Sequence, residues 1–215
     1  MVRHADTQED RAVRLLGAHG MIRHAELTKA GITGATVSRM KAKGLIVQLG
    51  RGLYQLADAP LDGNHTLAEA AKAVPRGIVC LVSALAFHGL TDTLPPRVWI
   101  AIGAKDWRPR VSQPALQIVR FNAAQLATGI EPHTIEGVTV RITSPARTIA
   151  DLFRYRQRAG RRYQNSPGLN LALEGLSEAL RQRKATPAEI ARVAGASGVW
   201  SIVQPYMEAM LAHGQ

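Results

Sequence analysis

The chain of 215 residues contains a single cysteine, Cys80. One thiol cannot form a disulfide within the chain, and a thiolate zinc site needs several, so both are excluded within one chain. Apolar residues flank Cys80 on both sides, at 78–79 and 81–82. This pattern predicts a small buried side chain rather than a nucleophile, in a protein of the reducing cytoplasm.

Long hydrophobic runs are also missing. No segment approaches the roughly 20 continuous apolar residues of a membrane span. Residues 1–10 are polar and lack the apolar core of a secretory signal. The hydrophobic fraction of 46% is nevertheless ample for a folded core. We therefore expect a soluble protein of two domains with no membrane partner.

Acidic residues are few, with 16 Asp and Glu against 27 Lys and Arg and a formal net charge of +11. Such a charge attracts polyanions, although a basic surface can also serve solubility alone. The distribution of the basic residues along the chain favours a polyanion as binding partner over a role in solubility alone. Between positions 29 and 51 the sequence contains five basic residues and no acidic one. The five are Lys29, Arg39, Lys41, Lys43 and Arg51.

Residues 1–57 have the pattern of a winged helix-turn-helix. Apolar residues recur at helical spacing in three segments, and a glycine-containing turn at Gly31–Thr33 separates the second from the third. A hairpin with Gly50-Arg51-Gly52 at its turn follows. Helices are expected at 8–18, 24–30 and 33–43, and strands at 45–49 and 53–56.

The third of these helices is amphipathic, with Val37 and Met40 expected to face inward and Thr33 to cap its start. Hydroxyl and basic side chains on the other face suit double-stranded DNA, because Arg can read guanine and Lys mostly contacts phosphate. Arg51, at the tip of the hairpin, is expected to reach a flanking phosphate or the minor groove. The alternative is a dimerisation or protein-docking module. The predicted DNA-binding residues are Thr33, Thr36, Ser38, Arg39, Lys41, Lys43 and Arg51.

A polar stretch with proline and glycine, 58–64, is expected to link this domain to a larger mixed α/β domain at 65–215. The whole chain is therefore predicted to be of the α+β class. Thr186-Pro187-Ala188-Glu189 has the residues of a capping box. Further helices are expected at 65–74, 83–88, 145–155, 169–182, 186–193 and 199–211, and strands at 97–102, 116–120 and 138–142.

Motifs of common enzymes are missing: the sequence has no GxxxxGK[ST], GxGxxG, HExxH or GxSxG. Ser83 and His88 are poor candidates for a nucleophile and base, because five residues along one helix point them apart. His19 and His24 bracket a turn, but two imidazoles without further ligands make a weak metal site. We expect no catalytic residues, metal or cofactor.

A nuclease delivered to DNA by the first domain is the enzymatic alternative. Such an enzyme needs clustered carboxylates for Mg²⁺, often beside a lysine. Residues 58–215 contain no ExK element, and the candidate acids are expected in loops rather than on one strand. These acids are Asp92, Asp106, Glu131 and Glu136.

Arginines gather between 144 and 162, where Asp151 is the only acid. Arginine-rich stretches bind phosphates or acidic protein surfaces, although a solvated loop after a helix explains the same composition. The arginines are Arg147, Arg154, Arg156, Arg158, Arg161 and Arg162.

Three segments resemble AbiEi-type antitoxins, the transcriptional-regulator half of type IV toxin-antitoxin systems. They are the Gly50-Arg51-Gly52-Leu53-Tyr54 pattern, the segment Ser144–Arg156 and the segment Leu171–Leu176. Of these, Ser144–Arg156 is the more specific and the N-terminal pattern the less. The stretch Arg158–Gly168 departs from the resemblance, because it is longer than the tight loop expected there.

The resemblance implies a winged-helix repressor that binds operator repeats upstream of its own operon. It also implies an α/β C-terminal domain for antitoxicity and a nucleotidyltransferase-like toxin as partner, bound directly or opposed at its target. The expected antitoxin surface is Arg147, Arg154, Arg156 and Arg158. A DNA-binding regulator without a toxin partner stays open, as does the choice between a monomer and a weak dimer.

Overall fold

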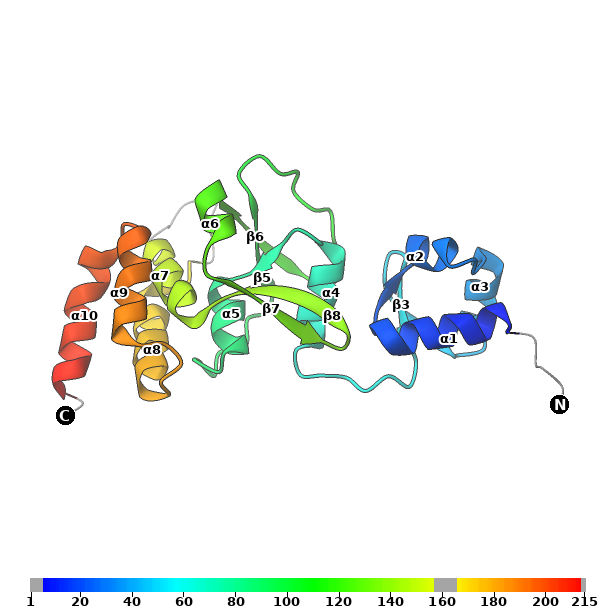
Figure 1. The fold of residues 1–215 in the computed structure, drawn as a ribbon, viewed down its shortest axis with the longest axis horizontal. Helices are drawn as coiled ribbons and strands as arrows, with labels where there is room; N and C mark the ends of the chain where they lie inside the picture. The colour runs from blue at the N-terminus through cyan, green and yellow to red at the C-terminus, as the bar shows by residue number, and fades with distance from the viewer. Residues whose placement is uncertain (1–5, 157–165, 214–215) are drawn as a thin grey trace. The chain divides into compact units, whose positions relative to one another are not determined.

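A computed structural model describes residues 6–156 and 166–213, and they form a mixed α/β protein (Figure 1). The mixture of helices and strands that the α+β prediction requires is therefore confirmed. The described chain divides into two compact units. The first contains the described residues up to Arg76, together with 109–116 and 133–140. The second contains 77–108, 117–132 and the described residues from Arg141 onward.

The first unit starts with three helices and a small antiparallel sheet of order β1-β3-β2. Their apolar side chains form one core, in which Leu16, Leu27 and Ile32 are each 1% exposed. Burying such a side chain stabilises a fold by about 1.5–3 kcal/mol. The elements are α1 (Gln8–His19), β1 (Ile22–Arg23), α2 (His24–Lys29), α3 (Gly34–Ala42), β2 (Ile46–Gly50), β3 (Leu53–Leu56) and α4 (His65–Ala73).

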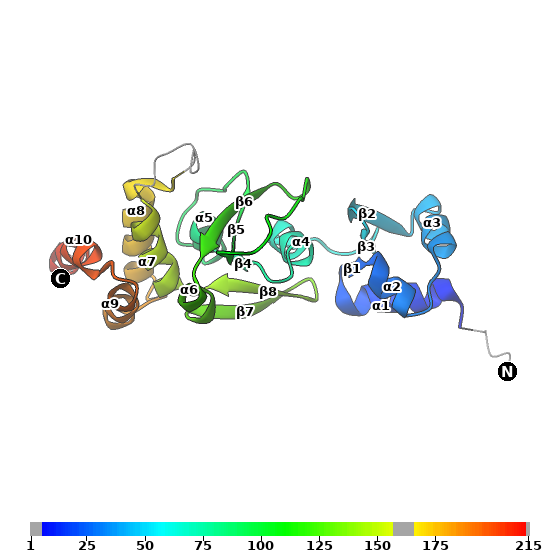
Figure 2. The same ribbon diagram turned by 90° about the horizontal axis from the view of Figure 1, so that it is seen from above.

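Helix α3 begins as its sequence predicts. Thr33 is the N-cap, and its hydroxyl accepts a hydrogen bond from the backbone N of Thr36 at 3.3 Å. Val37 and Met40 are buried, so the predicted inward face is confirmed. Gly44 follows the helix with φ +70°, a conformation that favours glycine. Figure 2 shows α3 beside β2, which pairs with β3.

The two-residue strand β1 was not expected from the sequence. Ile22 lies opposite Tyr54 and Arg23 opposite Leu53, so the segment after α1 adds a third strand to the hairpin. A strand this short has no alternation of polar and apolar residues that a sequence pattern could reveal.

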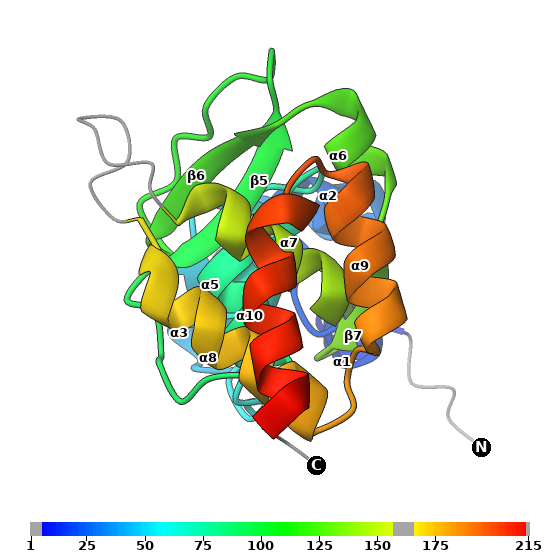
Figure 3. The same cartoon turned by 90° about the vertical axis from the view of Figure 1, so that its left-hand side faces the viewer.

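The second unit contributes most of a five-stranded sheet of order β6-β5-β4-β8-β7, in which β4 is antiparallel to β5 and parallel to β8. Helix α7 packs against α8 and α9, and α10 packs against α9 (Figure 3). The strands are β4 (Ile78–Val79), β5 (Val98–Gly103), β6 (Leu116–Phe121), β7 (Ile130–Ile135) and β8 (Val138–Thr143). The helices are α5 (Leu81–Phe87), α6 (Ala123–Ala127), α7 (Pro145–Tyr155), α8 (Gly168–Arg181), α9 (Pro187–Ala196) and α10 (Trp200–His213).

Close packing of α8 on α5 depends on Gly175. A Cβ atom at this position would lie 2.6 Å from Cδ1 of Leu85, which is fully buried. The glycine therefore lets the two helices approach each other. At the start of α9, Thr186 and Glu189 form the predicted capping box.

Strand β7 and helix α6 were not predicted. Pro132 lies inside β7 and cannot donate a hydrogen bond, but β7 is at the edge of the sheet, where proline is tolerated. Glu131 belongs to this strand, so its expected place in a loop is wrong. Asp92, Asp106 and Glu136 lie outside helices and strands, as expected.

Candidate nucleic-acid interface

The exposed face of α3 carries most of the predicted DNA-binding side chains. Ser38, Arg39, Lys41 and Lys43 are exposed, and so is Thr33 at the N-cap. The Lys41 ammonium donates a hydrogen bond to Gln48 Oε1 on β2 at 2.8 Å. Arg51 is exposed in the turn between β2 and β3, and it has no ion-pair partner among the residues that the structure describes.

Thr36 is the exception, because it is only 3% exposed and does not lie on the outward face. Its hydroxyl donates a hydrogen bond to Gln8 Oε1 at 2.7 Å. The expectation that Thr36 faces outward is therefore wrong. Thr36 precedes Met40 by four residues and so shares the buried face of the helix.

Gln8 joins the start of α1 to the start of α3. Its Oε1 atom also accepts hydrogen bonds from the backbone N of Thr33 at 3.0 Å and from the Thr33 hydroxyl at 3.1 Å. The N-terminal turns of the two helices are thus fixed relative to each other. This contact orients the exposed face of α3 within the first unit.

The basic face of α3 is opposed by one acid, Glu9 of α1. Its carboxylate forms ion pairs with Arg39 at 3.0 Å and Lys43 at 2.9 Å. The hydrogen bond from Lys43, reinforced by the charges of Lys43 and Arg39, holds the pKa of Glu9 below its usual value. Sequence reasoning missed this contact, because Glu9 is 30 residues from Arg39 along the chain.

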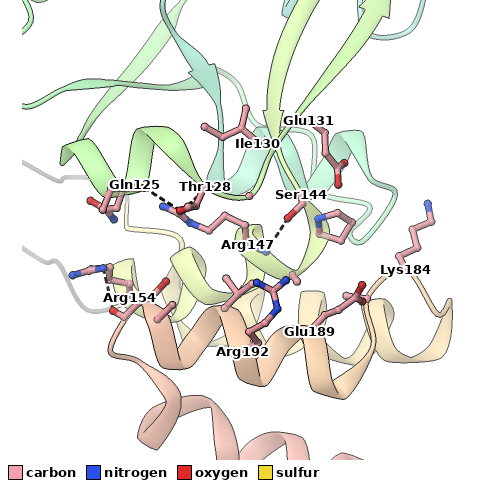
Figure 4. Close-up of a pocket in the computed structure, with 18 of the residues that line it drawn as sticks. Gln125, Thr128, Ile130, Glu131, Ser144, Arg147, Arg154, Lys184, Glu189 and Arg192 are labelled. Atoms are coloured by element: carbon pink, nitrogen blue, oxygen red, sulfur yellow. Dashed lines mark hydrogen bonds between the residues drawn. The ribbon is translucent and has the colours of Figure 1, made fainter.

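In the second unit, Arg147 is buried rather than on the surface. It is 3% exposed, and its Nε donates to Oδ2 of Asp151, 0% exposed, at 2.8 Å. Its Nη1 donates to the Thr128 carbonyl oxygen at 2.9 Å (Figure 4). The guanidinium carbon lies 5.4 Å from the centre of the Phe121 ring. The expected antitoxin-surface role of Arg147 is therefore wrong, because the residue stands one turn from Asp151 on the inward face of α7.

Burial dominates the ionisation of Asp151. It raises the pKa of this carboxyl from 3.8 to about 6, although the neighbouring Arg147 charge and hydrogen bond act in the opposite direction. Burial also raises the pKa of the Cys80 thiol, which is fully buried. The predicted burial of Cys80 is confirmed.

The other arginines of this region differ in position. Arg154 and Arg156 are half-buried; Nη1 of Arg154 donates to the Ser197 carbonyl oxygen, and Nη1 of Arg156 to that of Phe153. Both can still present donors outward. Arg158 lies outside the described residues, as do Arg161, Arg162 and most of the stretch 158–168.

Ser83 and His88 serve the core. Ser83 is buried, and its Oγ accepts a hydrogen bond from the backbone N of Trp99 at 2.9 Å. His88 is buried, with Nε2 2.7 Å from the carbonyl oxygen of Thr143. These contacts favour structural roles for both side chains.

No group of three or more His, Cys, Asp and Glu side chains among residues 6–156 and 166–213 could hold a metal ion. None of the helices in these ranges is both long and apolar enough to cross a membrane.

No curated protein matches the chain. Among solved structures, the crystal structure of the RV2827C protein from Mycobacterium tuberculosis is similar at a TM-score of 0.48 and 14% sequence identity, over 90% of this chain and 83% of that chain. The segments Ser144–Arg156 and Leu171–Leu176 lie outside residues 10–57, the range that matches a family model, so their resemblance stays a prediction. Residues 10–57 match the family described as "Transcriptional regulator, AbiEi antitoxin", which confirms the sequence resemblance over this range.

Proposed function

We propose that the first unit contains a winged helix-turn-helix that binds double-stranded DNA. In this proposal the protein is a repressor of its own operon and the antitoxin of a type IV toxin-antitoxin system. The observations that carry it are the exposed basic face of α3 and the exposed Arg51 turn, both within the residues that match a transcriptional-regulator family.

The geometry supports α3 as the helix that enters the major groove. Helix α2 precedes it across a short turn, and the β2–β3 hairpin follows it, the order of elements in a winged helix. Arg39 is then the candidate reader of guanine, and Lys41 and Lys43 contact phosphates. Ser38 supplies a hydroxyl donor for phosphates or base edges, whereas the hydroxyl proton of Thr33 already goes to Gln8 Oε1. Arg51 contacts a flanking phosphate or the minor groove.

Glu9 makes DNA binding an exchange of partners. Arg39 and Lys43 must leave its carboxylate before they reach DNA, whereas Arg51 has no acidic partner to leave among the described residues. Phosphates carry the same charge as the carboxylate and can replace it. The contact of Arg51 with DNA therefore adds more net affinity than the contact of either Arg39 or Lys43.

Antitoxicity is assigned to the second unit, with Arg154 and Arg156 as its described surface candidates. Their remaining donors can pair with an acidic face of a nucleotidyltransferase-like toxin or with RNA used by such an enzyme. Co-expression of the full-length Arg154→Glu/Arg156→Glu variant with the neighbouring toxin tests this assignment through growth. Loss of rescue with intact operator binding is expected; full rescue contradicts the assignment.

The test of DNA reading is a panel of the upstream region and shuffled versions of it, with fluorescence anisotropy as readout. Arg39→Ala is expected to weaken binding to the natural sequence by about 1–3 kcal/mol and to flatten the preference between sequences. Lys41→Ala is the matched comparison, because it is expected to weaken binding to all sequences alike. An unchanged specificity ratio in Arg39→Ala, or cleavage of the DNA when Mg²⁺ is added, overturns the proposal.

A further inference from the structure

The second unit has a cavity of about 560 Å³ that is open to solvent (Figure 4). Its walls come from α6, the start of β7, the N-terminal turn of α7, and α9 with the residue pair before it. Pockets for small ligands commonly have volumes of roughly 300–1,000 Å³. The cavity therefore has the size of a site for a small organic molecule.

The charge of the cavity is positive. Four cationic side chains line it against two acids, and all six come from the second unit. Figure 4 shows Arg192 rising from α9 below Ser144, with Arg154 and Lys184 toward opposite sides. The six are Arg147, Arg154, Lys184, Arg192, Glu131 and Glu189.

Arg192 is the cation most available to a ligand. Among the described residues its guanidinium donates no hydrogen bond, whereas Lys184 donates to the carbonyl oxygen of His88 and Arg154 to that of Ser197. Glu189 lies near Arg192, but its carboxylate caps α9 through the backbone N and hydroxyl of Thr186. This acid is therefore only a partial counter-charge for Arg192.

The start of α7 adds donors to the same wall. Ser144 is the N-cap, and its hydroxyl accepts from the backbone N of Arg147 at 3.4 Å, which leaves its own proton for another acceptor. The first N–H groups of a helix have no carbonyl partner within the helix. In α7 the N–H of Arg147 donates to the Ser144 hydroxyl, and the N–H of Thr148 donates to the Ser144 carbonyl oxygen. Pro145 has no N–H, so the N–H of Ala146 is the donor left for a ligand.

Two buried donors of the lining residues are also unsatisfied. Nη2 of Arg147 and Nε2 of Gln125 have no hydrogen-bond partner within the described chain. Buried polar atoms without partners are uncommon in folded proteins. Together with the surplus of positive charge, these two donors indicate that the cavity lining has more hydrogen-bond donors than acceptors.

We propose that this cavity binds a small organic molecule that carries a phosphate or carboxylate group. The anionic oxygens contact the Arg192 guanidinium, the Ser144 hydroxyl and the Ala146 N–H, and the charge of Arg154 adds to the attraction, whereas the charge of Arg147 is balanced by Asp151. An ionised acceptor makes shorter and stronger hydrogen bonds with such donors than a neutral one does. The residues of this ligand site all belong to the second unit, so none of them is a predicted DNA-binding residue.

The test uses the full-length protein with two probes, sodium phosphate and sodium citrate, each compared with sodium chloride at equal ionic strength. Backbone amide NMR shifts of Ala146 and Arg192 give the location and the Kd. The variant is Arg192→Gln. Its matched control is Arg181→Gln, which removes an exposed arginine that pairs with Glu178 outside the cavity.

For wild type and Arg181→Gln we expect saturable shifts at Ala146 with at least one probe. For Arg192→Gln we expect a Kd at least about tenfold weaker, the usual loss for a charged hydrogen-bond donor. Saturable shifts with phosphate alone indicate a ligand with a phosphate group, and saturable shifts with citrate alone indicate a ligand with carboxylate groups. DNA binding measured on the same Arg192→Gln sample should be unchanged, so failure of this site and failure of the DNA proposal are distinguishable.

Three results overturn the proposal. The first is no saturable shift with either probe, and the second is an equal Kd in wild type and Arg192→Gln. The third is a single-stranded RNA that binds through Arg192 while neither small anion does, because the occupant is then a nucleic acid.

Discussion

Two ion pairs, one from each unit, lie in opposite environments. The Arg39 and Glu9 side chains of the first unit are 59% and 25% exposed, whereas those of Arg147 and Asp151 in the second are 3% and 0% exposed. Exposed pairs are screened by water and salt, so their partners can be exchanged for a ligand. A buried pair cannot lose one partner without leaving a charge in the core. The Arg39–Glu9 pair is therefore suited to reversible contact, whereas the Arg147–Asp151 pair belongs to the fixed core.

The largest expected effect is on the buried pair. We predict that Asp151→Ala lowers the free energy of unfolding by about 3–5 kcal/mol, because it leaves the Arg147 charge buried without its partner. Urea unfolding of the full-length protein measures this. The double variant Arg147→Met/Asp151→Leu should recover much of the loss. If Asp151→Ala costs no more than Asp6→Ala, which removes an exposed pair with Arg14, the contrast between buried and exposed pairs fails.

A second effect concerns two glycines with positive φ, one in each unit. At Gly129 (φ +64°) a Cβ atom would lie 2.9 Å from Cβ of Arg147, whereas at Gly44 (φ +70°) nothing lies within 4 Å. Both alanine variants carry backbone strain, of order 1–3 kcal/mol. We predict that Gly129→Ala is the more destabilising by about 1 kcal/mol or more, because it also displaces Arg147. Equal losses in thermal or urea unfolding would contradict the close packing at Gly129.

The pH dependence of stability gives a third contrast. Burial raises the pKa of Asp151 to about 6 from 3.8, so between these values the folded state binds the proton more tightly than the unfolded state. The contribution of Asp151 to stability therefore falls as pH rises from about 4 to about 6, by at most about 1.4 kcal/mol per pH unit.

Urea unfolding of wild type and Asp151→Asn at several pH values isolates this contribution, since the other carboxyls are common to both proteins. We expect the stability of wild type relative to Asp151→Asn to decrease across the window. A difference that stays constant or increases with pH would show that the Asp151 pKa is not raised.

The smallest expected effect is a change in DNA affinity when the exposed ion pairs of Glu9 with Arg39 and Lys43 are removed. Glu9→Gln should increase affinity for the upstream DNA by roughly two- to fivefold, because Arg39 and Lys43 no longer leave an ionised partner. Asp6→Asn is the matched control, since it removes an exposed acid of the same region that pairs with Arg14 instead. Anisotropy titrations at low salt measure both. A decrease in affinity for Glu9→Gln alone would mean that Glu9 orients Arg39 for DNA rather than competing with it.

Local sequence patterns predicted the elements of this protein well. Helical spacing placed Val37 and Met40 in the core, and the capping residues Thr33 and Thr186 marked true helix starts. Strand β7 was missed because Pro132 weakens a strand pattern, and only its position at the sheet edge makes proline acceptable.

Side-chain partners were harder to predict, because they depend on tertiary contacts. The Glu9 ion pairs join residues of two helices far apart in sequence, so the run of basic residues from 29 to 51 gave no sign of an opposing acid. For Arg147 a signal was present. Asp151 follows four residues later amid the apolar residues of α7, and this spacing fits an intrahelical ion pair facing the core.

The salt dependence of DNA binding tests the central claim most directly. A plot of log Kd against log salt concentration for the full-length protein and its upstream DNA should be steep, with a change of about 0.9 in slope for each phosphate contacted. Arg51→Gln should reduce the slope by about 1, whereas Arg181→Gln in the second unit should leave it unchanged. A wild-type slope near zero, or equal slopes for wild type and Arg51→Gln, would contradict the assignment of the α3 face and the Arg51 turn to DNA.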